Sequence, residues 1–135
     1  MTLVVDASVA FHWFFESDKS APAQTILSSG EPLIAPDLVM AEIASAAWKA
    51  SMFSNVPPSA AQTIVLEAQR EFDELVPCLT LKDGAIALAL ELRHSVYDCF
   101  YLALAERRQT HVVTADQRLI RRCAGTRFSN LVRPL

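Results

Sequence analysis

Short apolar runs recur along this chain, and none of them alternates with polar residues as a half-exposed strand does. The runs are residues 3–5, 33–35, 76–81 and 111–114, with a last one near 128–132. Continuous apolar strands of this length are typical of a parallel sheet that is covered on both faces. Parallel strands need long crossover connections, which are usually helices.

Longer segments of helical character do separate these runs, at about residues 36–53, 57–75, 83–94 and 97–108. Pro36 and Asp37 suit a helix start, because proline fits the first turn and an acid there is favoured by the helix dipole. The last segment has one apolar stripe at helical spacing, made by Tyr97, Phe100, Tyr101, Leu104 and Ala105. The alternation predicts an α/β fold, a three-layer α/β/α sandwich around a central parallel sheet.

The 135 residues fit a single domain that spans residues 1–135, since no linker or repeat interrupts them. Their 52% hydrophobic and 20% charged content excludes a disordered chain. The start lacks the features of a signal peptide, and no apolar run could cross a bilayer. The three cysteines have neither zinc-site nor disulfide spacing, and the three histidines share no spacing, so we expect structural or surface roles for the histidines. These features together predict a cytoplasmic protein.

Charge is distributed unevenly, although the net charge is only −3. The first 66 residues contain two lysines and six acids, whereas seven arginines and one acid follow from Arg107 onward. Arg118, Arg121 and Arg122 could therefore hold phosphate groups, with a solvated helix face as the equal alternative.

Two acids follow predicted strands. Asp6 comes directly after the run at 3–5, and Asp116 comes after the run at 111–114. Because ligands bind at the carboxyl ends of strands in an open parallel sheet, both acids should lie at one edge. Each also has a structural explanation, since an aspartate there could cap a helix that starts at the next residue.

Two further acids belong to predicted helices. Glu42 lies among apolar helix neighbours, where a carboxylate is costly to bury without compensation. Asp98 begins an apolar helix, where it could also be an ordinary first-turn acid. Together, clustered carboxylates would repel unless a cation lay between them, and such oxygen ligands select Mg²⁺ or Mn²⁺. These ions commonly meet substrate phosphate, which makes a phosphodiester the natural substrate. Ser8 and Thr114 could hydrogen-bond a carboxylate beside the metal.

Four sequence segments resemble the VapC toxins of the PIN-domain family, in the family's order. They are Val4-Val5-Asp6-Ala7-Ser8-Val9 followed by Trp13, Ala35-Pro36-Asp37-Leu38 with Ala41-Glu42-Ile43, Tyr97-Asp98-Cys99-Phe100-Tyr101-Leu102-Ala103-Leu104-Ala105, and Val113-Thr114-Ala115-Asp116 with Arg118-Leu119. Together they span almost the whole chain.

The resemblance implies an Mg²⁺- or Mn²⁺-dependent endoribonuclease that leaves 5′-phosphate and 3′-hydroxyl ends. It implies a metal site of Asp6, Glu42, Asp98 and Asp116, with Thr114 as the accessory hydroxyl and Ser8 near the metal. Beside such a metal, RNA could be contacted by Ser8, Arg118, Arg121 and Arg122. It also implies a homodimer that is inhibited by a VapB-type antitoxin, through which alone the pair binds operator DNA.

Other functions stay open from the sequence. A PIN nuclease could act in RNA processing instead, and a PIN fold could be a non-catalytic interaction module, although the intact set of four acids disfavours the latter. A receiver domain would need an acidic pair near the first strand and a late lysine, and a phosphatase of the Asp-x-Asp kind would need an acid at position 8, where this chain has Ser8.

Overall fold

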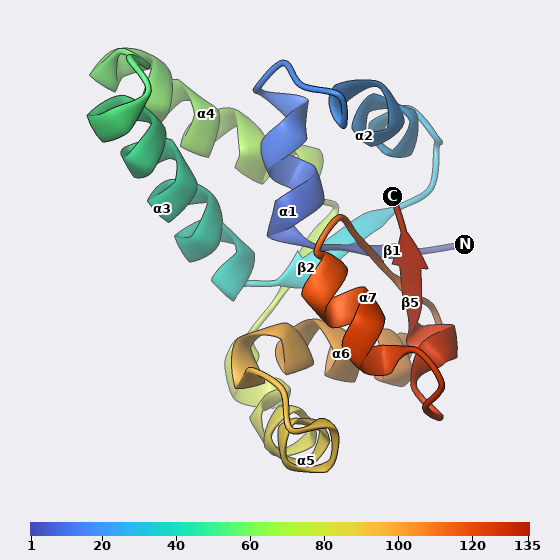
Figure 1. The fold of residues 1–135 in the computed structure, drawn as a ribbon. Coiled ribbons are helices and arrows are strands. Elements are labelled where there is room, and N and C mark those ends of the chain that lie inside the picture. The colour runs from blue at the N-terminus through green and yellow to red at the C-terminus, as the bar shows by residue number, and fades with distance from the viewer.

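A computed structural model describes all residues, 1–135, and has a central five-stranded sheet flanked by seven α-helices (Figure 1). The strands are β1 (Leu3–Val5), β2 (Leu33–Pro36), β3 (Glu74–Val76), β4 (Val112–Thr114) and β5 (Val132–Pro134). Their order across the sheet is β3-β2-β1-β4-β5, and every neighbouring pair is parallel. The predicted α/β fold with a parallel sheet is confirmed.

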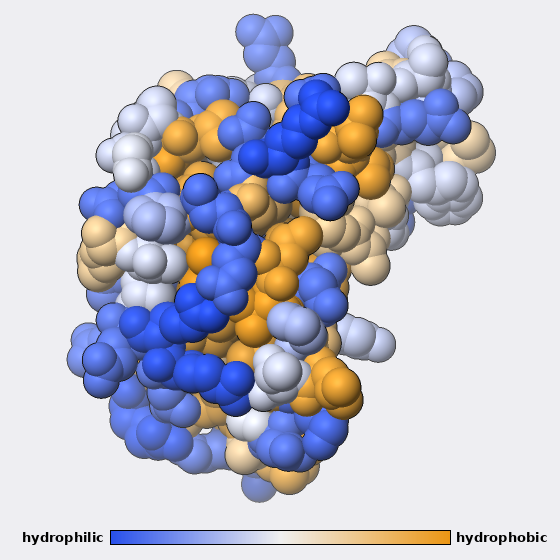
Figure 2. Space-filling view, turned by 180° about the vertical axis from the view of Figure 1, so that it is seen from behind, coloured by the Kyte–Doolittle hydropathy of each residue, from blue (hydrophilic) through white to orange (hydrophobic).

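The helices are α1 (Ala7–Ala10), α2 (Ser20–Leu27), α3 (Leu38–Phe53), α4 (Pro58–Glu71), α5 (Lys82–Leu92), α6 (Val96–Arg108) and α7 (Gln117–Cys123). Figure 1 shows α1 and α2 above the sheet and α5 and α6 below it. The pair α3–α4 extends away from the sheet, and the same pair forms the lobe that projects in the rear view of Figure 2. No helix has both the length and the apolar character needed to span a membrane.

The central strands explain why the apolar runs do not alternate. Every residue of β1, β2 and β4 is buried, because helices cover both faces of the sheet there. The edge strands β3 and β5 are largely exposed or half-buried. On the face seen in Figure 2, hydrophilic side chains divide the hydrophobic surface into separate patches.

Two predicted strand positions were wrong. The third strand is Glu74–Val76 rather than residues 76–81, since Pro77 has no N–H to continue the ladder and residues Cys78–Thr80 form a 3₁₀ turn. Helix α4 consequently ends at Glu71 instead of residue 75. The last strand is Val132–Pro134 rather than 128–132, because Phe128 is buried at the start of a 3₁₀ turn.

Two helical details also differ from expectation. Helix α2 has no counterpart among the predicted helices. Helix α6 is buried over most of its circumference rather than along one stripe, because it packs against β1, β2, β4 and α5. Tyr97, which was placed in that stripe, is 65% exposed in the first turn.

Candidate active site

The sheet order places two of the predicted acids at one point. Between β1 and β4 the order of strands reverses, so the chain leaves these neighbours in opposite directions. Val5 pairs with Val113 across the two strands, and Asp6 and Asp116 follow within a few residues. A crevice at the carboxyl ends of strands at such a switch point is where open α/β sheets bind ligands.

Asp6 is a buried carboxylate held by two hydroxyl groups. Only 5% of the residue is exposed. Its Oδ2 accepts hydrogen bonds from Thr114 Oγ1 at 2.7 Å and from Ser8 Oγ at 2.9 Å. It makes no side-chain cap of α1, so the helix-capping explanation is wrong for Asp6.

The pKa of Asp6 is raised, first by burial, which penalises the charged form. The hydrogen bonds from Thr114 and Ser8 lower the pKa in part, and the negative charges of Asp98 and Asp116 raise it again. Asp6 is therefore within electrostatic reach of two other predicted site residues.

Thr114 and Ser8 connect the ends of the two strands. Thr114 is fully buried, and its Oγ1 accepts from the backbone N–H of Asp116 at 3.0 Å while it donates to Asp6. Ser8 Oγ accepts from the backbone N–H of Ala115 at 3.0 Å and lies 3.3 Å from Thr114 Oγ1. The expected contact between these hydroxyls and a carboxylate is present.

Glu42 lies in the second turn of α3 and is bound by a buried tyrosine. The hydroxyl of Tyr101 donates to Glu42 Oε1 at 2.6 Å. Burial raises the pKa of Glu42 to about 7, the Tyr101 hydrogen bond opposes the shift, and the charges of Asp6 and Asp98 add to it. Glu42 is thus poised to change its protonation state near neutral pH.

Asp98 lies in the first turn of α6, as expected, and is paired with a histidine. His94 Nε2 lies 2.6 Å from Asp98 Oδ2, and the His94 side chain is only 8% exposed. The expectation of a purely structural or surface role missed this contact. His94 lies in the turn before α6, outside both helices, so helical spacing did not point to the contact, and its nearness to Asp98 in the sequence was the only signal.

Asp116 does cap a helix. Its Oδ1 accepts from the backbone N–H groups of Arg118 at 2.9 Å and Leu119 at 3.4 Å, at the start of α7. The capping explanation is therefore right for Asp116. Capping uses Oδ1, and no hydrogen bond involves its Oδ2.

The acids lack cationic partners within the chain. Asp98 is paired with His94, but Asp6, Glu42 and Asp116 form no salt bridge with a lysine or arginine. In the conformation seen, no three acidic, histidine or cysteine side chains converge closely enough to hold a metal ion. The pKa of Asp6 and of Glu42 is raised first by burial and then by the charges of neighbouring carboxylates, and a set of carboxylate oxygens fits a hard divalent cation.

Several surface pockets, called hollows below, lie beside these acids. One of about 400 Å³ is lined by Glu42, Asp98 and the exposed Tyr97, among others. Another of about 390 Å³ is lined by Ser8, Glu42 and Lys19, among others. A third, of about 350 Å³, is lined by His94 and the three arginines predicted to bind RNA: Arg118, Arg121 and Arg122.

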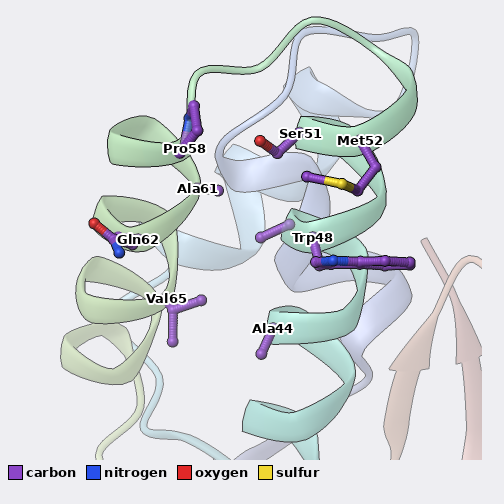
Figure 3. Close-up of a pocket in the computed structure, with 9 residues that line it drawn as sticks. Ala44, Trp48, Ser51, Met52, Pro58, Ala61, Gln62 and Val65 are labelled. Atoms are coloured by element: carbon purple, nitrogen blue, oxygen red, sulfur yellow. The ribbon is translucent and has the colours of Figure 1, made fainter.

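A separate cavity lies away from the acids, between α3 and α4. Figure 3 shows Trp48 and Met52 of α3 and Pro58 and Val65 of α4 around it. Its volume is about 270 Å³, and its lining contains no charged residue. An apolar groove of this kind is suited to a protein contact rather than to phosphodiester chemistry.

Known proteins are similar to this chain in sequence and in fold. Residues 3–125 match the family model of the PIN domain. The chain belongs to the PIN-domain family. Ribonuclease VapC3 of Pyrobaculum aerophilum is 32% identical to this PIN domain over 137 residues, covering 99% of this chain and 100% of the relative.

Solved structures with lower identity share the fold of this PIN domain. A crystal structure from Pyrobaculum aerophilum has a TM-score of 0.72 at 23% identity and covers 93% of this chain and 82% of that one. A toxin–antitoxin complex from Klebsiella pneumoniae has a TM-score of 0.71 at 16% identity, covering 97% and 95%. VapBC2 of Rickettsia felis, bound to a DNA fragment from its promoter, has a TM-score of 0.67 at 10% identity, covering 100% and 99%.

Proposed function

We propose that residues 1–135 form a single PIN domain that acts as a metal-dependent endoribonuclease, the toxin of a type II toxin–antitoxin pair. The observation that supports this most strongly is the buried Asp6 at the sheet's switch point, within electrostatic reach of Asp98 and Asp116. The pKa of Glu42 is likewise raised, first by burial and then by the charges of Asp6 and Asp98. The near full-length similarity to a protein named Ribonuclease VapC3 supports RNA as the substrate.

In this proposal the four carboxylates hold Mg²⁺ or Mn²⁺, and Thr114, Tyr101 and His94 position three of them. Thr114 and Ser8 fix Oδ2 of Asp6, Tyr101 fixes Oε1 of Glu42, and His94 fixes Oδ2 of Asp98. Ligands oriented by such outer hydrogen bonds bind metal more tightly. A bound divalent cation would lower the pKa of a water molecule and stabilise charge on the departing oxygen.

The reaction would be hydrolysis of an RNA phosphodiester by water, which leaves a 5′-phosphate and a 3′-hydroxyl. The residues of the chain would exclude bulk water from Asp6 and align the phosphate with the carboxylate edge. The proposed RNA contacts are Ser8, which lines the same hollow as Glu42, and the three arginines of α7.

A VapB-type antitoxin is the proposed partner, and operator DNA would be bound only through it. The similar folds of toxin–antitoxin complexes support this partner. The apolar groove between α3 and α4, with Trp48 and Met52 each 55% exposed, offers a surface for an apolar segment.

A homodimer is also proposed. Ile86 and Leu90 lie one turn apart on α5 and are 49% and 72% exposed, and Leu79 nearby is 76% exposed. Exposed apolar side chains on one face are typical of a protein interface. Sedimentation of the purified chain should give twice the monomer mass, and Leu90→Lys should shift it to the monomer.

The test of the nuclease is incubation of the antitoxin-free chain with total cellular RNA and Mn²⁺ or Mg²⁺. We expect discrete cleavage that EDTA abolishes and that is lost in Asp98→Asn, a variant that retains the shape of the side chain. The matched control is Asp83→Asn, an exposed acid in the first turn of α5. Folded, metal-supplied protein that leaves RNA intact, or cleavage that persists in Asp98→Asn, would contradict the proposal.

A further inference from the structure

The hollow beside Asp98 has a lining of unusual composition. It is formed by His94, Arg118, Arg121 and Arg122, and it contains no hydrophobic residue. The arginines occupy positions i, i+3 and i+4 of α7, so they share one face of that helix. His94 comes from the turn between α5 and α6, beside which α7 lies in Figure 1. Two separate parts of the chain thus build one cationic hollow of about 350 Å³.

The three arginines have no anionic partner. Other arginines of the chain do have one, as in the paired contacts of Arg108 with Glu74 and of Arg127 with Glu91. Arg118, Arg121 and Arg122 form no salt bridge and no side-chain hydrogen bond. Like charges three and four residues apart on a helix repel each other. An anion from outside the chain would relieve that repulsion.

The two nearby acids form no contact with the arginine side chains. Asp116 Oδ1 accepts from the start of α7, and Asp98 Oδ2 contacts His94 Nε2 at 2.6 Å. This second contact also connects the hollow to the candidate active site, because His94 touches Asp98 and lines the hollow at the same time. An anion bound here therefore lies next to the carboxylate edge.

We propose that this hollow is a phosphate subsite, which holds a backbone phosphate of the RNA next to the phosphodiester that is cleaved. The inference rests on the proposed function for the identity of the substrate. Planar guanidinium groups bind phosphate oxygens through paired hydrogen bonds, so several unpaired arginines at one place favour an anion such as phosphate. A site rich in carboxylates repels a polyanion, and the subsite supplies the attraction that holds the RNA against the acids.

The subsite has a defined kinetic consequence. It contacts the substrate outside the bond that reacts, so its loss weakens binding in the ground state and the transition state alike. Removal of the arginines should raise KM and leave kcat nearly unchanged. His94 acts differently, as a positioning residue that also orients Asp98.

The test compares two double variants with equal loss of charge. Arg121→Gln/Arg122→Gln removes two arginines from the hollow. Arg93→Gln/Arg133→Gln removes two exposed arginines that have no salt bridge and do not line it. Binding of a short fluorescein-labelled single-stranded RNA is measured in EDTA by anisotropy, over a series of salt concentrations. Melting curves check that both variants are folded.

We expect the hollow variant to bind RNA about 10- to 100-fold more weakly, with a salt slope shallower by about 0.7 for each lost phosphate contact. The control variant should bind within about twofold of the parent, since its arginines lie outside the subsite. With Mn²⁺, the hollow variant should show a raised KM and an unchanged kcat. Equal effects in both variants would overturn the subsite, because they would reflect net charge alone.

Inorganic phosphate, duplex DNA and the antitoxin serve as further binding probes. They distinguish an RNA phosphate from other ligands, and the cleavage assay distinguishes the subsite from the proposed nuclease. Should the hollow variant lose protection by inorganic phosphate in melting experiments but keep its RNA affinity, the hollow binds a free phosphate and the subsite is overturned. Should it lose affinity only for duplex DNA or for the antitoxin, the subsite is overturned as well. RNA binding that depends on the hollow, together with no cleavage by the parent protein, would support the subsite and contradict the nuclease.

Discussion

The hydroxyl of Tyr101 in α6 donates a 2.6 Å hydrogen bond to Oε1 of Glu42 in α3, although the two residues are 59 positions apart. Tyr101 is 1% exposed, so its hydroxyl needs a partner inside the protein. The contact joins a helix below the sheet to one above it, at the edge where the carboxylates gather (Figure 1). Glu42 is therefore held by the packing of the fold rather than by its own helix.

Tyr101→Phe should destabilise the protein without changing its shape. The variant removes the donor to a carboxylate, and a hydrogen bond to a charged group is worth about 1.5–3 kcal/mol. For a chain of this size the melting temperature should fall by roughly 5–10 °C at neutral or higher pH. Circular dichroism measures the change. Tyr97→Phe is the matched control, since Tyr97 is 65% exposed and its hydroxyl forms no hydrogen bond. A comparable fall in melting temperature in that variant would refute the role of the contact between Tyr101 and Glu42.

Glu42→Gln should change how stability depends on pH. The pKa of Glu42 is about 7 in the folded protein, above the ordinary value of 4.5. The folded state thus binds this proton more tightly than the unfolded state, so the protonated carboxyl contributes stability that is full below about pH 4.5 and lost as pH rises through about 7. Glutamine keeps the neutral form at every pH and still accepts from Tyr101.

The metal-free Glu42→Gln variant should therefore melt near the parent temperature at about pH 4.5 and a few degrees above it at about pH 8. Differential scanning fluorimetry across this range in EDTA measures the two curves. Glu16→Gln, an exposed carboxyl without a hydrogen bond, should run parallel to the parent. A constant offset of Glu42→Gln at all pH values would contradict the raised pKa.

The parallel sheet could be predicted from the sequence because β1, β2 and β4 are buried on both faces and are therefore apolar without alternation. The sequence pattern of the edge strands is weaker. Glu74–Val76 is exposed, half-buried and buried in turn, so the apolar residues after it attracted the prediction instead. In the neighbouring segment, residues 78–80 form a 3₁₀ turn with no buried residue, and only Leu81 after the turn is buried.

The candidate acids were predicted from their places after strands, at the start of a helix and, for Glu42, among apolar helix neighbours, whereas their partners were not. Tyr101 contacts Glu42 through tertiary packing, and His94 contacts Asp98 from the turn before α6; neither contact follows a sequence motif. From the sequence, Asp6 and Asp116 were equally good candidates for helix caps. In the structure the hydroxyls of Thr114 and Ser8 donate to Oδ2 of Asp6, and only Asp116 accepts from the backbone of the helix that follows it.

Thr114→Val should weaken metal binding as well as the fold. The isosteric change removes the hydroxyl that donates to Asp6 and accepts from the backbone of Asp116. Loss of these buried bonds should lower the free energy of unfolding by about 1–3 kcal/mol. Removal of a partner that orients a metal ligand should weaken Mn²⁺ binding about 10- to 100-fold. Electron paramagnetic resonance of free Mn²⁺ gives the affinity.

Thr114→Ser retains the hydroxyl and loses only a methyl group, so it is the control for Thr114→Val. Its Mn²⁺ affinity should stay near that of the parent, with a stability loss of about 1 kcal/mol for the missing buried carbon. If serine and valine weaken Mn²⁺ binding equally, the hydroxyl does not position Asp6 for a metal.

Asp6→Asn should have opposite effects with and without metal. Burial and the charges of Asp98 and Asp116 raise the pKa of Asp6, so its charge costs stability in the metal-free protein. Asparagine removes that charge and can still accept from Thr114 and Ser8. The metal-free variant should therefore melt at a higher temperature than the parent at neutral pH.

Metal should then stabilise the parent and not the variant. An ion that binds only the folded state at 100 times its dissociation constant adds about 2.7 kcal/mol, or roughly 8 °C in melting temperature. Titration of Mn²⁺ and Mg²⁺ in melting experiments should show this rise in the parent and in Asp18→Asn, an exposed acid without a hydrogen bond. An equal rise in Asp6→Asn would mean that the ions bind elsewhere, because the proposed site depends on the negative charge at the end of β1.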